Sequence, residues 1–369
     1  MHLAINASEL GRGRGGNESY IMGLIEGLVA LSSPPEVSVL TCEWGVDLHL
    51  PPIFRQVNLG PYRRLPFLLW QQTRALRRVK ADWYLSNFFL PLSLPCKGAV
   101  VVHDLSFRAH PEYFPASVAW YMRLLTGWAV RQAECVLTVS EFSRRELLRF
   151  YPAAKGKVSV VPNGVAREFA PLASGSEIGM DIRTLSSYGV TSPYILALGN
   201  IHPRKNLSRL LGAYLRLKEH RASTPNMVWV GASRWGSGEL LDRARSAGVV
   251  LTGFVAQEDL PAFYRCAVAL VYPSLYEGFG LPPIEAMACG TPVIVSDRTS
   301  LPEVVGEAAL LVDPTDVGKL TEAMSRLLDE NGLRERLRGA GLERSKRYTW
   351  PRAARRLLAA LDRGCYNSF

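Results

Sequence analysis

The sequence predicts an α/β protein built from two doubly wound, Rossmann-like domains. Short apolar segments alternate with longer amphipathic segments along most of the chain. This alternation is typical of parallel sheets that carry helices on both faces. The 369 residues leave room for two or three domains of ordinary size. An irregular stretch at 166–193, which contains Ala-Ser-Gly-Ser-Glu, is typical of a linker, so we expect domains at 1–168 and 169–350.

The apolar segments predict the strands of both sheets. In the first half they are 2–6, 37–41, 82–85, 98–102, 135–139 and 158–161. In the second half they are 194–198, 227–231, 249–252, 268–272, 292–295 and 309–312. Apolar residues at helical spacing predict helices between many of them, for example at 17–31, 117–133, 141–150, 205–218, 258–266, 316–328 and 351–362. Ligands of such sheets bind beyond the carboxyl ends of the strands, where the candidate site residues fall.

The composition is that of a soluble globular protein, with 48% hydrophobic and 21% charged residues. No apolar run approaches the roughly 20 residues that span a bilayer. The start, Met-His-Leu-Ala-Ile-Asn-Ala, resembles a first strand and not a signal peptide, so we expect a cytoplasmic protein. The net charge of +10 favours an anionic partner, which could be a nucleotide diphosphate, a nucleic acid or a negative membrane surface.

The most informative stretch, 272–293, places two carboxylates around a glycine turn and the start of a helix. Glu277 and Glu285 can accept hydrogen bonds from pairs of hydroxyls. Amides at a helix N-terminus, on a turn kept open by Gly278 and Gly280, suit an anionic oxygen. A sugar and a ribose joined by a diphosphate match this set. A capped helix could use Gly and Pro for geometry alone, but that would not explain Glu277 inside the turn.

A second candidate segment, Gly199-Asn-Ile-His-Pro-Arg-Lys-Asn-Leu207, follows a predicted strand and leads into a helix. Arg204 and Lys205 there could neutralise a leaving diphosphate. A solvated basic turn is the alternative.

Residues 272–293 resemble the Glu-x7-Glu motif of the retaining glycosyltransferases of family 4, which have the GT-B fold. The similarity continues through Gly-Thr-Pro-Val at 290–293, Ser296 and Leu-Pro-Glu-Val at 301–304. The resemblance implies two domains that face each other across a cleft. The first would take the acceptor and the second a nucleotide sugar, and the final helix, 351–369, would pack back on the first domain. The loop His-Asp-Leu-Ser-Phe at 103–107 favours mannosyltransferase-like relatives, and with them GDP-mannose over a UDP-sugar.

The resemblance also implies the roles of the site residues. Arg204 and Lys205 would stabilise the departing diphosphate, and Glu277 would hold donor-sugar hydroxyls. Glu285 would bind the ribose, and His103 would position the sugar from the first domain, although a lone histidine at a strand end is more often structural. Further donor-binding positions are Gly15, Gly16, Gly199, Gly278, Phe279, Gly280 and Leu281. One departure is Asn200, because many members of the family have Arg directly after the glycine.

The loop Gly11-Arg-Gly-Arg-Gly-Gly16 supports two interpretations. It fits the G-x-G-x-x-G pattern of dinucleotide-binding proteins. That fingerprint requires an acidic residue about 20 positions further on, and Glu43 lies somewhat beyond that spacing. In the glycosyltransferases a glycine loop at this place lies against the donor phosphates. A flexible turn remains the simplest interpretation for Arg12 and Arg14.

Residues 55–80 interleave basic with apolar and aromatic residues. The basic ones are Arg55, Arg63, Arg64, Arg74, Arg77, Arg78 and Lys80. A helix over 62–80 could dock on an anionic membrane at the inner face, or could equally pack on the core with a solvated basic face. Nucleic acid is disfavoured as a partner because no reader motif is present.

We expect neither a metal nor a cofactor. The chain contains no Asp-x-Asp, the pair that would bridge a metal to a diphosphate, and its six cysteines lack metal-site spacing. The expected substrates are a GDP- or UDP-linked sugar and a glycan or lipid-linked acceptor. An epimerase, a glycosyl phosphorylase, or a non-catalytic subunit that binds sugar nucleotides are the alternatives.

Overall fold

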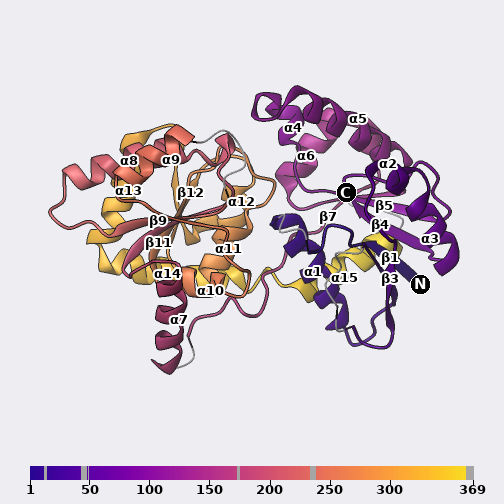
Figure 1. Ribbon diagram of the computed structural model, residues 1–369, viewed down its shortest axis with the longest axis horizontal. Coiled ribbons are helices and arrows are strands. Elements are labelled where there is room, and N and C mark those ends of the chain that lie inside the picture. Colours follow the sequence, from indigo (N-terminus) through magenta and orange to yellow (C-terminus); the bar gives the residue numbers. More distant parts are fainter. Residues whose placement is uncertain (12–14, 43–47, 49, 173–174, 233–237, 363–369) are drawn as a thin grey trace. The chain divides into compact units, whose positions relative to one another are not determined.

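The computed structural model describes the chain except residues 12–14, 43–47, 49, 173–174, 233–237 and 363–369 (Figure 1). It divides into two compact units. The N-terminal unit comprises Met1–Gly164 together with Thr349–Phe369, and the C-terminal unit comprises Val165–Tyr348. Each unit is a parallel sheet with helices on both faces (Figure 1).

The N-terminal sheet has seven parallel strands in the order β3-β2-β1-β4-β5-β6-β7. From β1 the chain adds β2 and then β3 on one side of β1. It then crosses to the other side of β1, where β4 pairs with it. The neighbours β1 and β4 therefore form a topological switch point, where ligands of such sheets bind. The strands are β1 (His2–Asn6), β2 (Glu36–Thr41), β3 (Phe54–Asn58), β4 (Trp83–Asn87), β5 (Lys97–Val102), β6 (Cys135–Thr138) and β7 (Val158–Val160).

The helices of this unit pack on an apolar core that includes Tyr84, Val100 and Val136. They are α1 (Gly16–Val29), α2 (Arg64–Pro66), the π-helix η1 (Phe67–Gln71), α3 (Gln72–Val79), α4 (Ser106–Ala109), η2 (Pro111–Tyr113), α5 (Ala116–Gln132), α6 (Glu141–Phe150), η3 (Pro152–Ala154) and α15 (Trp350–Asp362). Ser140 caps α6, because its hydroxyl oxygen accepts a hydrogen bond from the Ser143 amide at 3.0 Å.

The final helix, α15, packs against α1, and two glycines of α1 make room for it. A Cβ at Gly23 would lie 1.9 Å from Cε2 of Trp350, and one at Gly27 would lie 2.4 Å from the Trp350 carbonyl oxygen. No side chain fits at either position, so the close approach of the two helices depends on both glycines.

The C-terminal sheet has six parallel strands in the order β10-β9-β8-β11-β12-β13. Its switch point lies between β8 and β11. The strands are β8 (Tyr194–Leu198), β9 (Asn226–Val230), β10 (Val250–Gly253), β11 (Ala267–Tyr272), β12 (Val293–Ser296) and β13 (Leu310–Val312). Leu210, Tyr214 and Trp229 belong to the buried cluster that joins this sheet to its helices.

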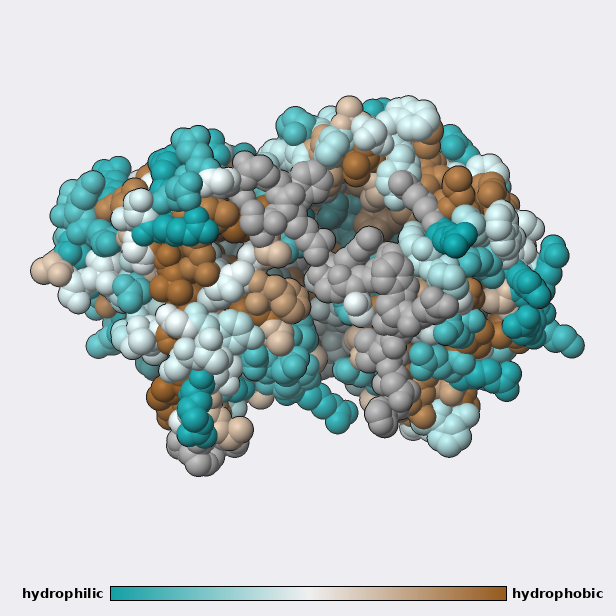
Figure 2. Space-filling model, in the orientation of Figure 1, coloured by the Kyte–Doolittle hydropathy of each residue, from teal (hydrophilic) through white to brown (hydrophobic). Residues whose placement is uncertain are grey.

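The helices of the C-terminal unit are α7 (Gly175–Ser187), η4 (Pro203–Lys205), α8 (Leu207–Glu219), α9 (Gly238–Ser246), α10 (Leu260–Arg265), α11 (Leu281–Ala288), α12 (Leu301–Val305), η5 (Gly306–Ala308), α13 (Val317–Asp329) and α14 (Asn331–Ser345). Figure 2 shows that hydrophilic residues dominate the visible surface of α8 and α9, whereas α7 carries both kinds. No helix in the described part of the chain is long and apolar enough to cross a membrane.

Two details of the sequence-based assignment were wrong. The stretch 166–193 is not simply a linker, because α7 forms within it. The helix is anchored by the buried Leu185 and by Asp181, whose carboxylate accepts hydrogen bonds from Nε and Nη2 of Arg265 on α10. The strand β3 was missed because Phe-Arg-Gln-Val-Asn is mostly polar, which an edge strand with an exposed side tolerates.

Candidate functional site

The two candidate segments of the C-terminal unit leave the sheet side by side. β8 and β11 pair in parallel, and Gly199–Lys205 follows the first while Pro273–Gly280 follows the second. Hydrogen bonds join the two segments, from the Leu275 amide to the Arg204 carbonyl at 2.7 Å and from Nδ2 of Asn206 to the Pro273 carbonyl at 3.1 Å. Sequence motifs about 70 residues apart thus meet at the switch point of this sheet.

Glu277 binds both basic residues of the other segment. Its Oε1 accepts a hydrogen bond from Nζ of Lys205 at 2.6 Å, and its Oε2 accepts one from Nη1 of Arg204 at 3.2 Å. Lys205 and Glu277 are buried, whereas the side chain of Arg204 keeps a quarter of its surface exposed. The structure therefore assembles three predicted residues into one cluster with two positive charges and one negative charge.

Tyr272, the last residue of β11, completes this cluster. Its hydroxyl donates to Oε1 of Glu277 at 2.9 Å and accepts from Nζ of Lys205, which also lies 4.5 Å from the centre of the tyrosine ring. The sequence analysis missed this residue because Tyr272 ends an otherwise apolar strand and looks like core. A hydroxyl at the last position of a strand, five residues before Glu277, is the signal that could have found it.

The charges of the cluster keep Glu277 ionised. Burial by itself would raise the pKa of this carboxyl, but Lys205, Arg204 and the hydrogen bonds from Lys205 and Tyr272 outweigh burial and lower the pKa to about 2. Tyr272 stays protonated, since burial and the neighbouring Glu277 raise its pKa well above the ordinary value. Glu277 therefore serves as the counter-charge of Lys205 and Arg204.

Glycines set the shape of both loops. Gly199 has a φ of 131°, and a Cβ there would lie 3.0 Å from Cε of Lys205. Gly280 has a φ of 97° and caps α11, and a Cβ there would lie 2.6 Å from Cδ2 of Leu301. Both positions combine a left-handed backbone with a close neighbour, so only glycine fits without strain.

Hydrogen bonds from the loop after β12 hold the turn that carries Glu277. The hydroxyl of Ser300 donates to the carbonyl oxygens of Glu277 at 2.9 Å and of Phe279 at 3.1 Å. The amide of Glu277 donates to the hydroxyl oxygen of Thr299 at 3.2 Å. Buried Phe279 also packs edge-on against Tyr348, with ring centres 5.4 Å apart. The turn leads directly into the N-terminus of α11 at Leu281.

Glu285 lies on α11 in a different environment from Glu277. It is buried, and its Oε2 accepts a hydrogen bond from the hydroxyl of Tyr264 at 2.7 Å. Burial raises the pKa of Glu285 to about 7, the charge of Glu168 acts in the same direction, and the Tyr264 hydrogen bond opposes them. The two carboxylates of the motif therefore differ in charge at neutral pH, with Glu277 ionised and Glu285 close to half protonated.

In the N-terminal unit, His103 follows β5 and is enclosed by aromatic rings. The ring of Tyr20 lies edge-on at 4.6 Å between centres, and that of Phe88 lies at 5.6 Å. Its Nε2 is 3.2 Å from Oδ1 of Asn87. Burial lowers the pKa of His103 to about 4, against the opposing charge of Asp104, so the imidazole is neutral at physiological pH. Asp104 itself accepts hydrogen bonds from the amide and hydroxyl of Ser106.

The glycine loop of this unit ends at the N-terminus of α1. Gly15 occupies the N-cap position with a φ of 70°. A Cβ at Gly15 or Gly16 would meet no atom within 4 Å, so packing does not require glycine at these two positions. The amide of Gly11 donates to Oε1 of Glu18 at 2.6 Å, which ties the loop to the first turn of the helix. Arg12 and Arg14 lie outside the described residues, as does Glu43.

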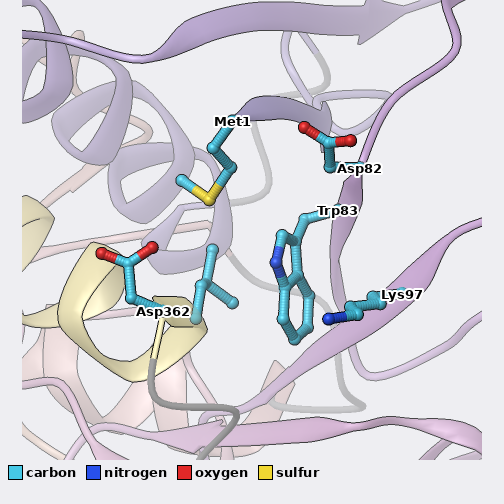
Figure 3. A pocket seen from close by; sticks show the side chains of 6 residues that line it. Met1, Asp82, Trp83, Lys97 and Asp362 are labelled. Atoms are coloured by element: carbon cyan, nitrogen blue, oxygen red, sulfur yellow. The ribbon is translucent and has the colours of Figure 1, made fainter.

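A pocket of about 360 Å³ lies elsewhere in the N-terminal unit (Figure 3). It is lined by Met1, Asp82, Trp83, Lys97, Leu361 and Asp362. Figure 3 shows the Lys97 side chain directed at the ring of Trp83, and its Nζ is 5.6 Å from the ring centre. Met1, Asp82, Trp83 and Lys97 lie at the amino-terminal ends of β1, β4 and β5. Parallel sheets bind their ligands at the opposite edge.

Among the residues that the structure describes, no three His, Cys, Asp or Glu side chains come close enough together to hold a metal ion. Arg204, Lys205 and the helix dipole at the start of α11 provide positive charge for an anion at this end of the sheet. This arrangement suits a phosphate-bearing ligand.

Comparison with known proteins assigns the chain to a family. The model of glycosyltransferase family 4 matches residues 14–169, and that of the glycosyl transferases group 1 matches residues 186–344. The O-antigen chain mannosyltransferase B of Escherichia coli is 34% identical over 286 residues, which cover 76% of this chain and 74% of that protein. The chain belongs to glycosyltransferase family 4. The expectation drawn from the Glu-x7-Glu motif is thereby confirmed.

Two further relatives of this glycosyltransferase are named as mannosyltransferases. WbdA of Escherichia coli, a serotype-specific mannosyltransferase, is 30% identical over 71% of this chain, which corresponds to only 33% of WbdA. The MMP alpha-(1->4)-mannosyltransferase of Mycolicibacterium hassiacum is 32% identical over 71% of this chain and 64% of that protein.

Solved structures confirm the GT-B fold of this glycosyltransferase. The sucrose-phosphate synthase of Thermosynechococcus elongatus superposes with a TM-score of 0.77 over 98% of both chains, at 22% sequence identity. WaaG, a glycosyltransferase of lipopolysaccharide biosynthesis, superposes with a TM-score of 0.73 over 98% of both chains, at 15% identity. At such identities the likeness concerns the fold alone.

Proposed function

We propose that this glycosyltransferase transfers mannose from a nucleotide-diphosphate mannose to a glycan or lipid-linked acceptor in the synthesis of a surface polysaccharide. The cluster of Lys205, Arg204 and Glu277 at the switch point of the C-terminal sheet is the observation that carries the proposal. The names of the relatives support mannose, because O-antigen chain mannosyltransferase B and WbdA are both mannosyltransferases. The C-terminal unit takes the nucleotide sugar and the N-terminal unit the acceptor.

In this proposal Lys205 and Arg204 stabilise the leaving diphosphate. The bond between the anomeric carbon and the phosphate oxygen breaks, and negative charge grows on that oxygen. Two cations held within 2.6–3.2 Å of Glu277 cannot move far, so they are preorganised for this charge. The dipole of α11 adds a positive potential at its N-terminus, where Leu281 supplies the first helical amide and Pro282 and Pro283 have no N–H. Gly199, Gly278, Phe279, Gly280 and Leu281 shape the walls of the same site.

Glu277 accepts a hydrogen bond from a hydroxyl of the donor sugar at the lone-pair position that the protein leaves open. A carboxylate has about four lone-pair positions, and Lys205, Tyr272 and Arg204 occupy three of them. The anion is fixed at neutral pH by a pKa of about 2, so it can accept and cannot donate. Glu285, when ionised, accepts from the ribose hydroxyls.

His103 positions the sugar as a neutral imidazole, since a pKa of about 4 excludes a role as a charged acid near neutral pH. Gly15 and Gly16 leave room for the donor phosphates next to the N-terminus of α1. Transfer retains the anomeric configuration, and the leaving phosphate takes the proton of the acceptor hydroxyl. The chain needs neither a metal nor a cofactor, because cations and helix termini take the place of a bridging metal.

A thermal-shift screen tests the donor specificity. Purified protein is heated with GDP, UDP, GDP-mannose, UDP-glucose and NAD(H) in separate samples. A ligand that binds only the folded protein raises the melting temperature by mass action. We expect GDP and GDP-mannose to give the largest rise. A rise with UDP alone would change the donor, and a rise with NAD(H) alone would reject the nucleotide-sugar proposal and make Gly11–Gly16 a dinucleotide site.

A transfer assay separates the remaining classes. With GDP-mannose and a mannose-containing lipid-linked acceptor, we expect one mannosyl product and one GDP per turnover. Turnover without an acceptor would indicate an epimerase, and dependence on inorganic phosphate would indicate a phosphorylase. Tight binding without turnover on any acceptor would indicate a non-catalytic subunit. We propose that the protein works in the cytoplasm, peripherally at the inner face of the membrane.

A further inference from the structure

The N-terminal unit exposes an apolar surface that its own core does not use. On α5, Trp120, Leu124 and Trp128 follow one another at helical spacing and keep 64%, 52% and 36% of their surface exposed. On α2 and η1, Leu65, Leu69 and Trp70 are exposed as well, and Leu92 lies in the loop before β5. We call these seven residues the tryptophan face.

Contacts tie together the three segments that carry the tryptophan face. The ring of Phe89, in the same loop as Leu92, packs on Tyr121 of α5 with ring centres 5.5 Å apart. The amide of Leu92 donates to the Leu68 carbonyl at 3.2 Å, and the hydroxyl of Thr73 donates to the Ser93 carbonyl at 2.6 Å. The loop therefore bridges α5 on one side to η1 and α3 on the other.

Burial explains why part of this surface escaped sequence analysis. Phe67, Ala75 and Leu76 are buried against the unit, so the segment 62–80 does pack on the core. The same segment nevertheless presents Trp70 and Leu69 to solvent. Residues 117–133 look like an ordinary amphipathic helix in the sequence. Only the fold shows that Ala119, Ala129 and Val130 form the buried side of α5. Trp120 and Trp128 are therefore exposed to solvent.

The charged residues within the segments that carry the tryptophan face have one sign. Exposed basic residues are Arg63, Arg74, Arg77, Arg78 and Lys80 next to η1, and Arg123 and Arg131 on α5. The sequence contains no Asp or Glu in residues 50–81, 83–103 or 113–133, which carry this surface. Arg74 and Arg78 follow Trp70 by one and two helical turns, so basic and aromatic side chains share one side of the helix.

We propose that the tryptophan face docks on the surface of a bilayer that contains anionic phospholipids. Tryptophan favours the boundary between headgroups and acyl chains, because its ring is apolar and its N–H still reaches water. Neighbouring arginines and lysines are attracted to the phosphates of such a surface. A symmetric dimer through this face is disfavoured, because it would bring two basic clusters together. The inference rests on surface chemistry and is independent of the donor and acceptor.

A second exposed apolar surface provides a matched control. On α7 of the C-terminal unit, Ile178 and Ile182 are about half exposed. The sequence of α7 contains only one basic residue, Arg183, and two acidic ones, Glu177 and Asp181. It therefore offers apolar contact without attraction to an anionic surface.

The test is vesicle flotation with the full-length protein. Vesicles are made of phosphatidylcholine alone or of phosphatidylcholine mixed with phosphatidylglycerol, and the bound fraction is measured at low and high salt. We expect binding to the mixed vesicles and little binding to phosphatidylcholine. The Trp120→Ala/Trp128→Ala variant should bind at least tenfold more weakly. The Arg77→Gln/Arg78→Gln variant should lose roughly tenfold in affinity, mostly at low salt, whereas Ile178→Ser/Ile182→Ser should bind like the wild type.

Melting temperature and light scattering accompany each variant. Because the substituted tryptophans are exposed, we expect melting temperatures and nucleotide binding equal to those of the wild type. Absence of vesicle binding by the wild type, or equal binding by all variants, would overturn the proposal. A wild-type dimer that the Trp120→Ala/Trp128→Ala variant converts to monomers, without any vesicle binding, would assign the face to self-association instead. Vesicle binding needs no catalysis, so this result cannot be confused with failure of the proposed transferase activity.

Discussion

Nζ of Lys205 lies 2.6 Å from Oε1 of Glu277, a residue 72 positions later in the chain, and both side chains are buried. Each depends on the other, since a buried charge without a partner is costly. The pair therefore stabilises the fold as well as the charge distribution of the site. Tyr272 contacts both members, which fixes the pair at the end of β11.

Glu277→Gln should lower kcat/KM by about 10²–10³. The amide keeps the size of the side chain, but it leaves Lys205 and Arg204 without a counter-charge and offers the sugar a weaker acceptor. Stability should fall by about 3–5 kcal/mol, because two charges lose their buried partner. Steady-state kinetics and denaturant unfolding measure the two effects.

The matched control for this variant is Glu330→Gln. Glu330 pairs with Arg326 at 3.0 Å on the surface, where about half of each side chain is exposed. Its loss should leave both kinetics and stability unchanged within about 0.5 kcal/mol. Wild-type activity in a folded Glu277→Gln protein would contradict the role assigned to Glu277.

Gly199→Ala should impair the site through Lys205. The new Cβ would lie 3.0 Å from Cε of Lys205, on a backbone with a φ of 131°. We expect Lys205 to shift away from Glu277 and KM for the donor to rise about tenfold or more. Gly248→Ala separates backbone strain from this contact. Gly248 also has a positive φ, 81°, but its Cβ would meet only Nζ of Lys218 at 3.9 Å. Equal kinetic losses in both variants would show that Lys205 is not the cause.

Donor affinity should weaken as pH falls through 7. Glu285 has a pKa of about 7, and only its ionised form accepts two hydrogen bonds from ribose hydroxyls. The ionised fraction falls about tenfold between pH 8 and pH 6, so the dissociation constant of GDP should rise by about the same factor. Calorimetric titration across this range is the measurement. Glu285→Gln should bind more weakly at pH 8 and show a flat profile, and an equally sloped profile in that variant would exclude Glu285 as the titrating group.

Stability of the free protein should depend on Glu285 in the opposite direction. Its pKa rises from the ordinary 4.5 to about 7 on folding, so the folded state holds a proton that the unfolded chain releases. Stability from this group is present below pH 4.5 and is lost as pH rises through 7. Without ligand, Glu285→Gln should therefore gain melting temperature relative to the wild type at pH 8 and gain little at pH 5. A gain that grows towards low pH would contradict the assigned pKa.

Activity should survive a chelator. The positive charges around the proposed diphosphate site are Lys205, Arg204 and the N-terminus of α11. We expect kcat to change less than twofold, roughly, when EDTA replaces added Mg²⁺ or Mn²⁺. Lys205→Met should remain inactive under both conditions. Activity that disappears with EDTA and returns with Mn²⁺ would show that a metal takes part.

Gly23→Ala should destabilise the N-terminal unit without touching the site of the C-terminal unit. Its Cβ would lie 1.9 Å from Cε2 of Trp350, so α15 has to move away from α1. Overpacking of this kind costs about 1–3 kcal/mol or more. Gly339→Ala is the control, since a Cβ there meets no atom within 4 Å. Thermal melting of both variants makes the comparison, and equal melting temperatures would contradict the packing described here.

The sequence was sufficient for the architecture, and it singled out the motif residues as candidates. Apolar runs such as Tyr194–Leu198 coincide with the observed strand, because a parallel strand buried on both faces must be apolar along its whole length. Charged residues that follow a buried strand are seldom needed for packing, and the same is true early in a helix that follows a glycine turn. For this reason the sequence singled out Arg204, Lys205, Glu277 and Glu285. The strand β3 was not recognised because an exposed edge strand has few apolar residues. The helix α7 was not recognised because an ion pair, which leaves no apolar periodicity in the sequence, helps to anchor it.

Only the tertiary structure decided which residues distant in the chain contact one another. Sequence spacing says nothing about whether Lys205 reaches Glu277 or whether Tyr272 joins them, because β8 and β11 become neighbours only when the sheet order reverses between them. The same holds for charge and exposure. Glu277 is ionised and Glu285 nearly half protonated because of different buried neighbours, and Trp120 and Trp128 are exposed because other residues of α5 fill the core. Secondary structure follows from the local sequence pattern. The protonation state and the solvent exposure of a side chain depend on which distant residues the fold places beside it.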